Sequence, residues 1–256
     1  MAFEYISVEE AMQRDGLRMV VIGGTPSPWG EAAKGLLHIK KIDWSAVRLD
    51  HGSEVLSAWA GQQGGPVAFY NNEKPRSGWA EILLLTERLA PTPSLLPANP
   101  ADRALVMGLA HELLGEEGLG WSRRLQLVQA GLQGTGGFKE PVAKYLAAKY
   151  GHRPDTKPAN EVRVASLLRM LAGRLAVQRE AGSSYYVGHS LSAADIYSAT
   201  IMALFRPLPQ EQCEMRASTR AAFETLDAET KAALHPALIE HRDMIYAQHL
   251  ELPLSL

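Results

Sequence analysis

Cysteine is nearly absent from the sequence: Cys213 is the only one among 256 residues. No disulfide can form within the chain, and there is no CxxC pair for redox chemistry or for zinc. A chain of this kind fits a reducing compartment, so we expect a cytoplasmic protein.

The sequence also lacks an excess of one charge and a long apolar run. It has 26 Lys and Arg against 28 Asp and Glu, a net charge of −2. Because no basic block appears, we expect neither nucleic acid nor a membrane surface as a partner. Apolar runs such as ILLL at 82–85 are too short to span a bilayer, and the acidic start MAFEYISVEE lacks the pattern of a secretory signal.

Several motifs of catalysis and cofactor binding are missing as well. Neither the dinucleotide pattern GxGxxG nor the phosphate loop GxxxxGK[ST] occurs, and there is no GxSxG nucleophile elbow. The stretch HELLG at 111–115 begins like a zinc-protease helix but has Gly115 in place of the second histidine. We therefore expect no metal, and we interpret His111 as a residue on a helix face.

The first part of the chain alternates between strand and helix signals. SVEE at 7–10 is a capping-box pattern, which predicts a short helix ending before Gly16. The further expected elements are a strand at 17–24, a helix at 31–40, a strand at 44–50, a helical or irregular segment at 54–62, a strand at 67–70 with a possible short return strand at 74–76, and a helix at 80–89. Parallel strands followed by a hairpin indicate an α/β domain, which we place at 1–90 with the N-terminal helix as an extension.

The rest of the chain is dominated by helix signals. Residues 91–100 contain four of the 15 prolines, and we interpret them as a linker. Beyond it we expect an all-α domain over 101–256, with helices at 101–114, 140–150, 161–181, 193–205 and 236–250. One face of the longest helix is formed by Val164, Leu168, Leu171 and Leu175.

The stretch TPSPWG at 25–30 joins a buried strand to a helix. A helix N-terminus has free N–H groups and a partial positive charge, so it attracts anions. Pro28 suits the first helical turn, where its missing N–H costs nothing. Ser27 is then either the N-cap or a hydroxyl that donates a hydrogen bond to a bound thiolate and lowers the pKa of that thiol. Thr25 is a second hydroxyl on the same turn.

Two later turns also contain residues suited to a ligand. In GGPV at 64–67, Pro66 can form a cis peptide bond and Gly65 allows close approach of a ligand; the alternative is an ordinary edge-strand proline. In RSGW at 76–79, Ser77 can cap a helix or bind a carboxylate, and Arg76 can pair with a carboxylate. The alternative here is a simple cap beside a solvated arginine.

The stretch HSLSAADIYSA at 189–199 contains a complete helix-start signal. Ser192 and Asp195 form an S-x-x-D capping box, and Leu191 and Ile196 form a hydrophobic staple. This device starts a buried helix, so its role is structural rather than catalytic.

From about residue 17 onward, the chain resembles the glutathione transferases. The stretches that carry the resemblance are, in order, GGTPSPWGEAAKGLL, GGPV, LLPANPADRALV and LSAADIY. The resemblance implies a thioredoxin-like α/β N-terminal domain followed by an all-α helical bundle domain, and a homodimer.

The resemblance also implies roles for individual residues. Glutathione would be a cosubstrate whose thiolate attacks an electrophilic, mostly apolar small molecule between the domains. Ser27 matches the thiol-activating hydroxyl, with Thr25 as the alternative. The implied glutathione-binding residues are Trp29, Gly65, Pro66, Arg76 and Ser77. The implied second-substrate pocket contains Met107, His111 and Trp121.

One departure from the family pattern concerns the third helix start. Members carry an acid-Ser pair that holds the γ-glutamyl group, whereas this chain reads Arg76-Ser77-Gly78. The missing acid favours an alternative function, a non-catalytic ligand-binding or scaffold protein of the same fold. A glutathione-dependent reductase or lyase is a third hypothesis, and Ser27 argues against it because that class often needs a cysteine at the turn.

Overall fold

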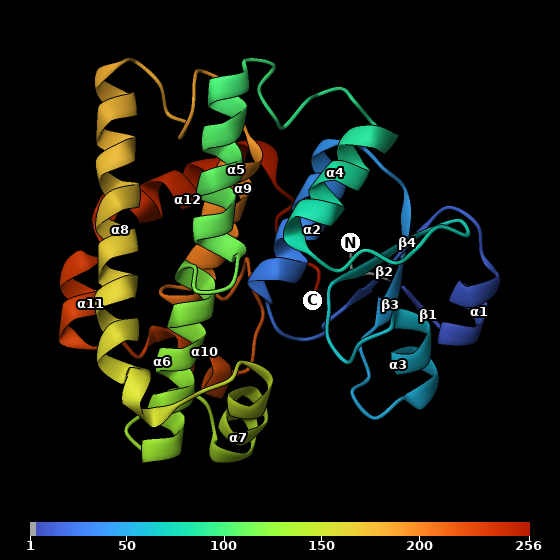
Figure 1. The fold of residues 1–256 in the computed structure, drawn as a ribbon, viewed down its shortest axis with the longest axis horizontal. Helices are drawn as coiled ribbons and strands as arrows, with labels where there is room; N and C mark the ends of the chain where they lie inside the picture. Colours follow the sequence, from blue (N-terminus) through green and yellow to red (C-terminus); the bar gives the residue numbers. More distant parts are fainter. Residues whose placement is uncertain (1–3) are drawn as a thin grey trace.

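The computed structural model describes residues 4–256, except for the side chains of residues 156–158. It has an α/β unit followed by an all-helical unit (Figure 1). The α/β unit contains β1 (Tyr5–Ile6), α1 (Val8–Gln13), β2 (Leu17–Val21), α2 (Pro28–Ile39), β3 (Trp44–Arg48), α3 (Glu54–Ala60), β4 (Val67–Tyr70) and α4 (Trp79–Leu89). The helical unit contains α5 (Pro100–Leu114), α6 (Leu119–Gln133), α7 (Glu140–Lys149), α8 (Lys157–Glu180), α9 (Ala193–Ile201), α10 (Ala217–Glu224), α11 (Ala228–Ala233) and α12 (Pro236–His249), with short 3₁₀ turns at Pro154–Thr156 and Met202–Leu204.

The sheet has the strand order β1-β3-β2-β4. The first three strands run parallel, and β4 pairs antiparallel with β2. The expected return strand at 74–76 is reduced to one bridge between Ala68 and Arg76. The N-terminal extension adds the edge strand β1, which the sequence did not indicate, before α1. Ser7 caps α1 as predicted, because its hydroxyl accepts the Glu10 N–H at 3.1 Å.

Each face of the sheet is covered by helices. Met19 and Val21 of β2 belong to the core shared with α2 and α4, whereas Val20 points to the smaller core shared with α1 and α3. This alternation is what a strand with both faces buried produces. Figure 1 shows α2 and α4 between the sheet and the helical unit. These two helices therefore connect the α/β unit to the helices that follow.

Helix α9 lies at the centre of the helical unit, and all of its residues are buried. The predicted capping box starts it: the Asp195 carboxylate accepts the Ser192 N–H at 2.9 Å and the Ser192 hydroxyl at 2.7 Å. The same carboxylate accepts the Tyr186 N–H at 2.8 Å and lies 3.1 Å from the His241 Nε2. Asp195 therefore joins the start of α9 to α12 and to the loop after α8.

Most expected helices are present, but α6, α10 and α11 were not expected. Helix α6 buries polar side chains, among them Ser122, Arg123, Arg124 and Gln129. It consequently lacks the apolar stripe by which a helix is detected in sequence. The predicted apolar face of α8 is confirmed, since Val164, Leu168, Leu171 and Leu175 are all buried.

Replacing Asp195 by alanine should lower the free energy of unfolding by about 3 kcal/mol, because it leaves several buried donors without an acceptor. The control is Asp227→Ala, which removes the half-buried cap of α11 that accepts the Thr230 N–H at 2.8 Å. A loss of about 1–2 kcal/mol is expected for this half-buried cap. Urea unfolding measures both, and equal losses would contradict the central role of Asp195.

Candidate functional site

A cavity of about 780 Å³ lies between the two units. The α/β unit contributes the turn before α2, the segment before β4 and the start of α4, and the helical unit contributes the ends of α5 and α7 and the first part of α6. This volume is in the range of small-molecule sites, and a position between domains is common for them.

Ser27 lies at the N-cap position of α2 and lines this cavity. Its side chain makes no capping hydrogen bond, although its carbonyl oxygen accepts the Glu31 N–H at 2.8 Å. The interpretation of Ser27 as a side-chain cap is therefore wrong. With only 6% of its surface exposed, Ser27 has a hydroxyl on the cavity wall that the helix does not use.

Thr25, the second hydroxyl of the turn, does not line the cavity. It is half-buried, and its carbonyl oxygen accepts the Ser27 N–H at 2.8 Å. Of the two hydroxyls singled out in the sequence, the fold brings only that of Ser27 to the cavity.

The Gly65–Pro66 peptide bond is cis, and both residues line the cavity. The prediction of a cis proline before the strand is confirmed. A Cβ atom at residue 65 would lie 3.2 Å from the Val20 carbonyl oxygen, which is tighter than most Cβ contacts. Glycine therefore suits this position, where the backbone passes close to the end of β2.

The start of α4 is capped differently from the expectation. Gly78, not Ser77, is the N-cap residue, and the Glu81 carboxylate accepts the N–H groups of both residues at 3.2 Å. Ser77 lines the cavity, but the interpretation of its side chain as the cap is wrong. The helix terminus that the sequence suggested for a ligand carboxylate already binds a carboxylate of the chain itself.

Arg76 does not line the cavity. Its Nη2 lies 2.6 Å from the Glu73 carboxylate, and its Nη1 donates to the Lys74 carbonyl oxygen at 2.9 Å. Arg88 binds the same carboxylate, and its hydrogen bond, with that of Arg76, holds the pKa of Glu73 below its usual value. Arg76 is thus engaged in an ion-pair cluster outside the site.

The residues expected for the second-substrate pocket divide into two groups. His111 and Trp121 line the cavity, whereas Met107, one turn earlier on α5, packs against the core instead. Trp79 also lines the cavity, and its ring meets that of His111 edge-on with centroids 6.4 Å apart.

The sequence did not single out the positive charges of the cavity. Arg124 of α6 and Lys149 of α7 both line it, and so does Tyr150. The guanidinium carbon of Arg124 lies 5.0 Å from the Trp29 ring centroid and 5.6 Å from that of Tyr150. Burial lowers the pKa of Lys149, and the charge of Arg124 lowers it further. No sequence signal indicates these residues, because only the packing of α6 and α7 brings them to the turn before α2.

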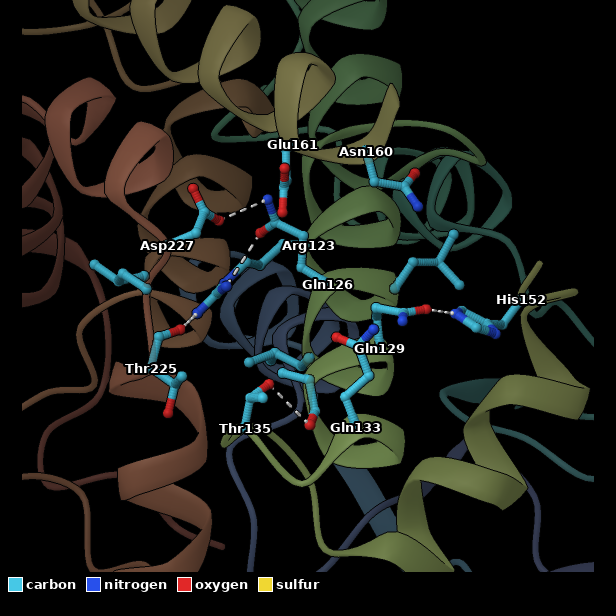
Figure 2. A pocket seen from close by; sticks show the side chains of 14 residues that line it. Arg123, Gln126, Gln129, Gln133, Thr135, His152, Asn160, Glu161, Thr225 and Asp227 are labelled. Atoms are coloured by element: carbon cyan, nitrogen blue, oxygen red, sulfur yellow. Dashed lines mark hydrogen bonds between the residues drawn. The ribbon is translucent and has the colours of Figure 1, made fainter. Parts of the chain in front are cut away.

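A second cavity, of about 190 Å³, lies beside α6 and the segment between α10 and α11. Figure 2 shows hydrogen bonds between its polar side chains, such as those of Gln126 with Asp227 and of Gln129 with His152. Arg123 donates to the carbonyl oxygens of Leu204, Phe223 and Thr225, and burial lowers its pKa to about 9. We interpret this network as a structural link between α6 and the C-terminal helices.

The single cysteine of the chain lies away from the large cavity. Cys213 does not line it, and burial raises the pKa of that thiol to about 11. Among the residues that the structure describes, no group of three or more His, Cys, Asp or Glu side chains could hold a metal ion. Within the same residues, no helix has the length and apolar character needed to cross a membrane.

No family model matches the sequence, and no curated protein does. Solved structures do resemble it. A glutathione S-transferase from Methylobacterium radiotolerans, in complex with glutathione sulfonate, has 17% identity and a TM-score of 0.62 over 91% of each chain. A glutathione transferase family member from Pseudomonas fluorescens, with two glutathione bound, has 12% identity and a TM-score of 0.62 over 93% of this chain and 94% of the other.

A third structure, a glutathione S-transferase from Methylobacillus flagellatus with glutathione bound, has 14% identity and a TM-score of 0.62 over 91% of this chain and 96% of the other. The chain therefore has the glutathione transferase fold, a thioredoxin-like α/β domain followed by an all-α domain. The fold expected from the sequence is confirmed.

Ser27→Ala should change the free energy of unfolding by less than about 0.5 kcal/mol, because no capping hydrogen bond is lost. The matched control is Ser53→Ala: the Ser53 hydroxyl caps α3 by accepting the Leu56 N–H at 3.1 Å, and its removal should cost about 1 kcal/mol. Urea unfolding of both variants measures the difference. If Ser27→Ala lowers the free energy of unfolding as much as Ser53→Ala does, the Ser27 side chain caps α2 after all.

Proposed function

We propose that the protein is a glutathione transferase, which joins the glutathione thiolate to an electrophilic small molecule. The observation that carries this proposal is the Ser27 hydroxyl, which lines the cavity at the N-terminal end of α2 and caps nothing. The cis Gly65–Pro66 bond on the same wall and the glutathione bound in neighbours of the same fold support it. Glutathione is then a cosubstrate, and the protein a homodimer in the cytoplasm.

In the proposed mechanism, Ser27 stabilises the thiolate. A free thiol has a pKa of about 8.5, and a hydroxyl donor together with the positive end of a helix lowers it. The thiol proton leaves to solvent, so no protein base is needed beside Ser27. With an aryl halide, the sulfur attacks the ring carbon, a C–S bond forms, the C–halogen bond breaks, and the halide leaves with the electron pair.

The proposed position of glutathione uses both walls of the α/β unit. Its cysteinyl backbone pairs with Gly65 beside Pro66, Trp29 lies against it, and Ser77 faces the γ-glutamyl end. At that end, Glu81 occupies the N–H groups of Ser77 and Gly78 and repels an incoming carboxylate. We therefore expect glutathione to bind, but less tightly than at a helix terminus with free N–H groups.

A non-catalytic ligand-binding or scaffold protein of the same fold is the alternative. The chain offers no acid at 76–78, and the only carboxylate bound at the start of α4 is that of Glu81. Such a protein would use the same cavity for small molecules without a thiol reaction.

Ser27→Ala should lower kcat/KM with 1-chloro-2,4-dinitrobenzene roughly 10- to 100-fold, because a hydrogen bond to a charged sulfur is lost. The bound thiol then has a higher pKa, so the fraction of thiolate at neutral pH falls and the rate profile moves to higher pH. Ultraviolet absorbance of the thiolate measures this pKa directly. Thr25→Ala is the control and should leave both the rate and the thiol pKa unchanged. An unaltered rate for Ser27→Ala would contradict the proposal that its hydroxyl stabilises the thiolate.

Glu81→Gln should tighten glutathione binding about fivefold, because a neutral amide holds the Ser77 and Gly78 N–H groups less strongly than a carboxylate does and leaves them to the γ-glutamyl carboxylate. Calorimetric titration of the native chain and the variant measures this effect. Glu54→Gln, in the first turn of α3, is the control and should have no effect. If neither the native chain nor the variant binds glutathione at millimolar concentration, the alternative function replaces the transferase.

A further inference from the structure

The two cations of the large cavity have no anionic partner among the described residues. Arg124 is 9% exposed, and its Nε is buried without a hydrogen-bond partner. Its guanidinium lies over the rings of Trp29, Phe138 and Tyr150, and the Lys149 ammonium lies 5.9 Å from the Tyr150 ring centroid. Glu116 also lines the cavity, but it is exposed and forms no ion pair with either cation in the part of the chain described.

The other buried arginines provide a comparison within the same chain. Arg18 donates to the carbonyl oxygens of Ala11, Gly16 and Asn71. Arg123 is bonded to carbonyl oxygens in the same way (Figure 2), and Arg242 donates to the Asp243 carboxylate at 2.6 Å. The fold therefore supplies acceptors to buried guanidinium groups elsewhere. Arg124 differs because it has no acceptor from the described residues and lines the cavity, where a ligand can supply one.

The position of Lys149 brings the second positive charge to the same place. A Cβ atom at Gly64 would lie 2.7 Å from the Lys149 Nζ, so this ammonium lies against the segment before the cis peptide bond. The Arg124 guanidinium carbon and the Lys149 Nζ lie 5.6 Å and 5.9 Å from the centroid of the same ring, that of Tyr150, so the two positive charges are neighbours and repel each other. An anion bound between them would reduce this repulsion, and it would give the buried Arg124 charge an ionic partner.

The walls around these charges are aromatic. Trp29 and Tyr150 flank the Arg124 guanidinium, and their ring centroids are 6.5 Å apart. Trp121 meets Tyr150 edge-on at 4.6 Å. Flat rings stack well against such walls, so the cavity combines an aromatic surface with an unpaired positive pole.

We propose that Arg124 and Lys149 hold the anionic group, a carboxylate or sulfonate, of a second substrate whose body is aromatic. This inference names the substrate class of the site and therefore rests on the proposed function. In the reaction the two cations position the ring beside Ser27 and take no part in proton transfer. The second substrate is thus an aromatic acid rather than a neutral apolar molecule.

A pair of fluorescent probes tests the charge directly and needs no glutathione. They are 8-anilinonaphthalene-1-sulfonate and the neutral N-phenyl-1-naphthylamine, which share the same rings and differ in the sulfonate. The native chain should bind the sulfonate about tenfold more tightly, and added salt should reduce that preference. Equal affinity for the two probes would overturn the proposal.

Variants of Arg124 and Lys149 test whether these two residues cause the preference for the sulfonate probe. Lys149→Gln and Arg124→Gln should each weaken sulfonate binding about tenfold and leave the neutral probe unaffected. Lys144→Gln is the control on the same helix, because Lys144 pairs with Glu140 and does not line the cavity. Arg124→Lys keeps the charge and should retain most of the sulfonate affinity, which separates loss of charge from loss of folding. If Lys149→Gln binds the sulfonate probe as tightly as the native chain does, the assignment of Lys149 to the anion site is wrong.

Conjugation assays distinguish an aromatic acid from the carboxylates of glutathione. Lys149→Gln should lower the ratio of kcat/KM for 4-chloro-3-nitrobenzoate to kcat/KM for 1-chloro-2,4-dinitrobenzene about tenfold, and Lys144→Gln should leave this ratio unchanged. If the KM for glutathione rises instead, the cations bind the tripeptide and the inference is wrong. If no conjugation occurs but the sulfonate preference and its loss in the variants are observed, the transferase proposal fails and the anion site stands.

Discussion

The packing of α2 on α9 determines where the site lies. Gly35 allows this contact: a Cβ atom there would lie 2.9 Å from the Leu250 side chain and 3.1 Å from that of Ile196 in α9. The start of α9 is in turn held by Asp195, so the capped helix is a fixed surface for α2. Ser27 is the N-cap residue of α2, so the packing of α2 against the helical unit fixes the position of the Ser27 hydroxyl. Trp29 adds a direct link, since its Nε1 donates to the Leu114 carbonyl oxygen at 2.8 Å beside the cavity.

Two helix N-termini meet at this cavity, and they differ in how their N–H groups are occupied. At α2, the N-cap side chain makes no hydrogen bond, and Pro28 has no N–H to satisfy. At α4, the Glu81 carboxylate binds the first N–H groups and neutralises the positive end of the helix. The positive side chains of the cavity therefore lie on α6 and α7 and not at α4, and an anion is drawn toward them.

The sequence predicts the local features of this fold and site well, and the tertiary ones poorly. Strand, turn and helix order follow from apolar runs, prolines and the S-x-x-D signal, which act over a few residues. Whether Ser27 caps its helix depends on the rotamer of one side chain, and whether Ser77 does depends on competition from Glu81. Arg124 and Lys149 could not be predicted, because α6 buries polar residues and hides its helical period, and because the meeting of α6 with α7 is a long-range contact.

Helix α7 connects the charge of the cavity with its shape. Tyr145 lies on this helix, and its hydroxyl is 3.2 Å from the His51 Nδ1 of the α/β unit, so α7 borders the segment that leads to Pro66. Lys149, at the last residue of the same helix, reaches the Gly64 backbone. In the function that we propose, the α/β unit supplies the hydroxyl and the cis peptide bond that face the thiol, and the helical unit supplies the cations and rings that face the second substrate. Because these groups lie on separate elements, the selectivity of the site can change with α6 and α7 while the Ser27 turn stays the same.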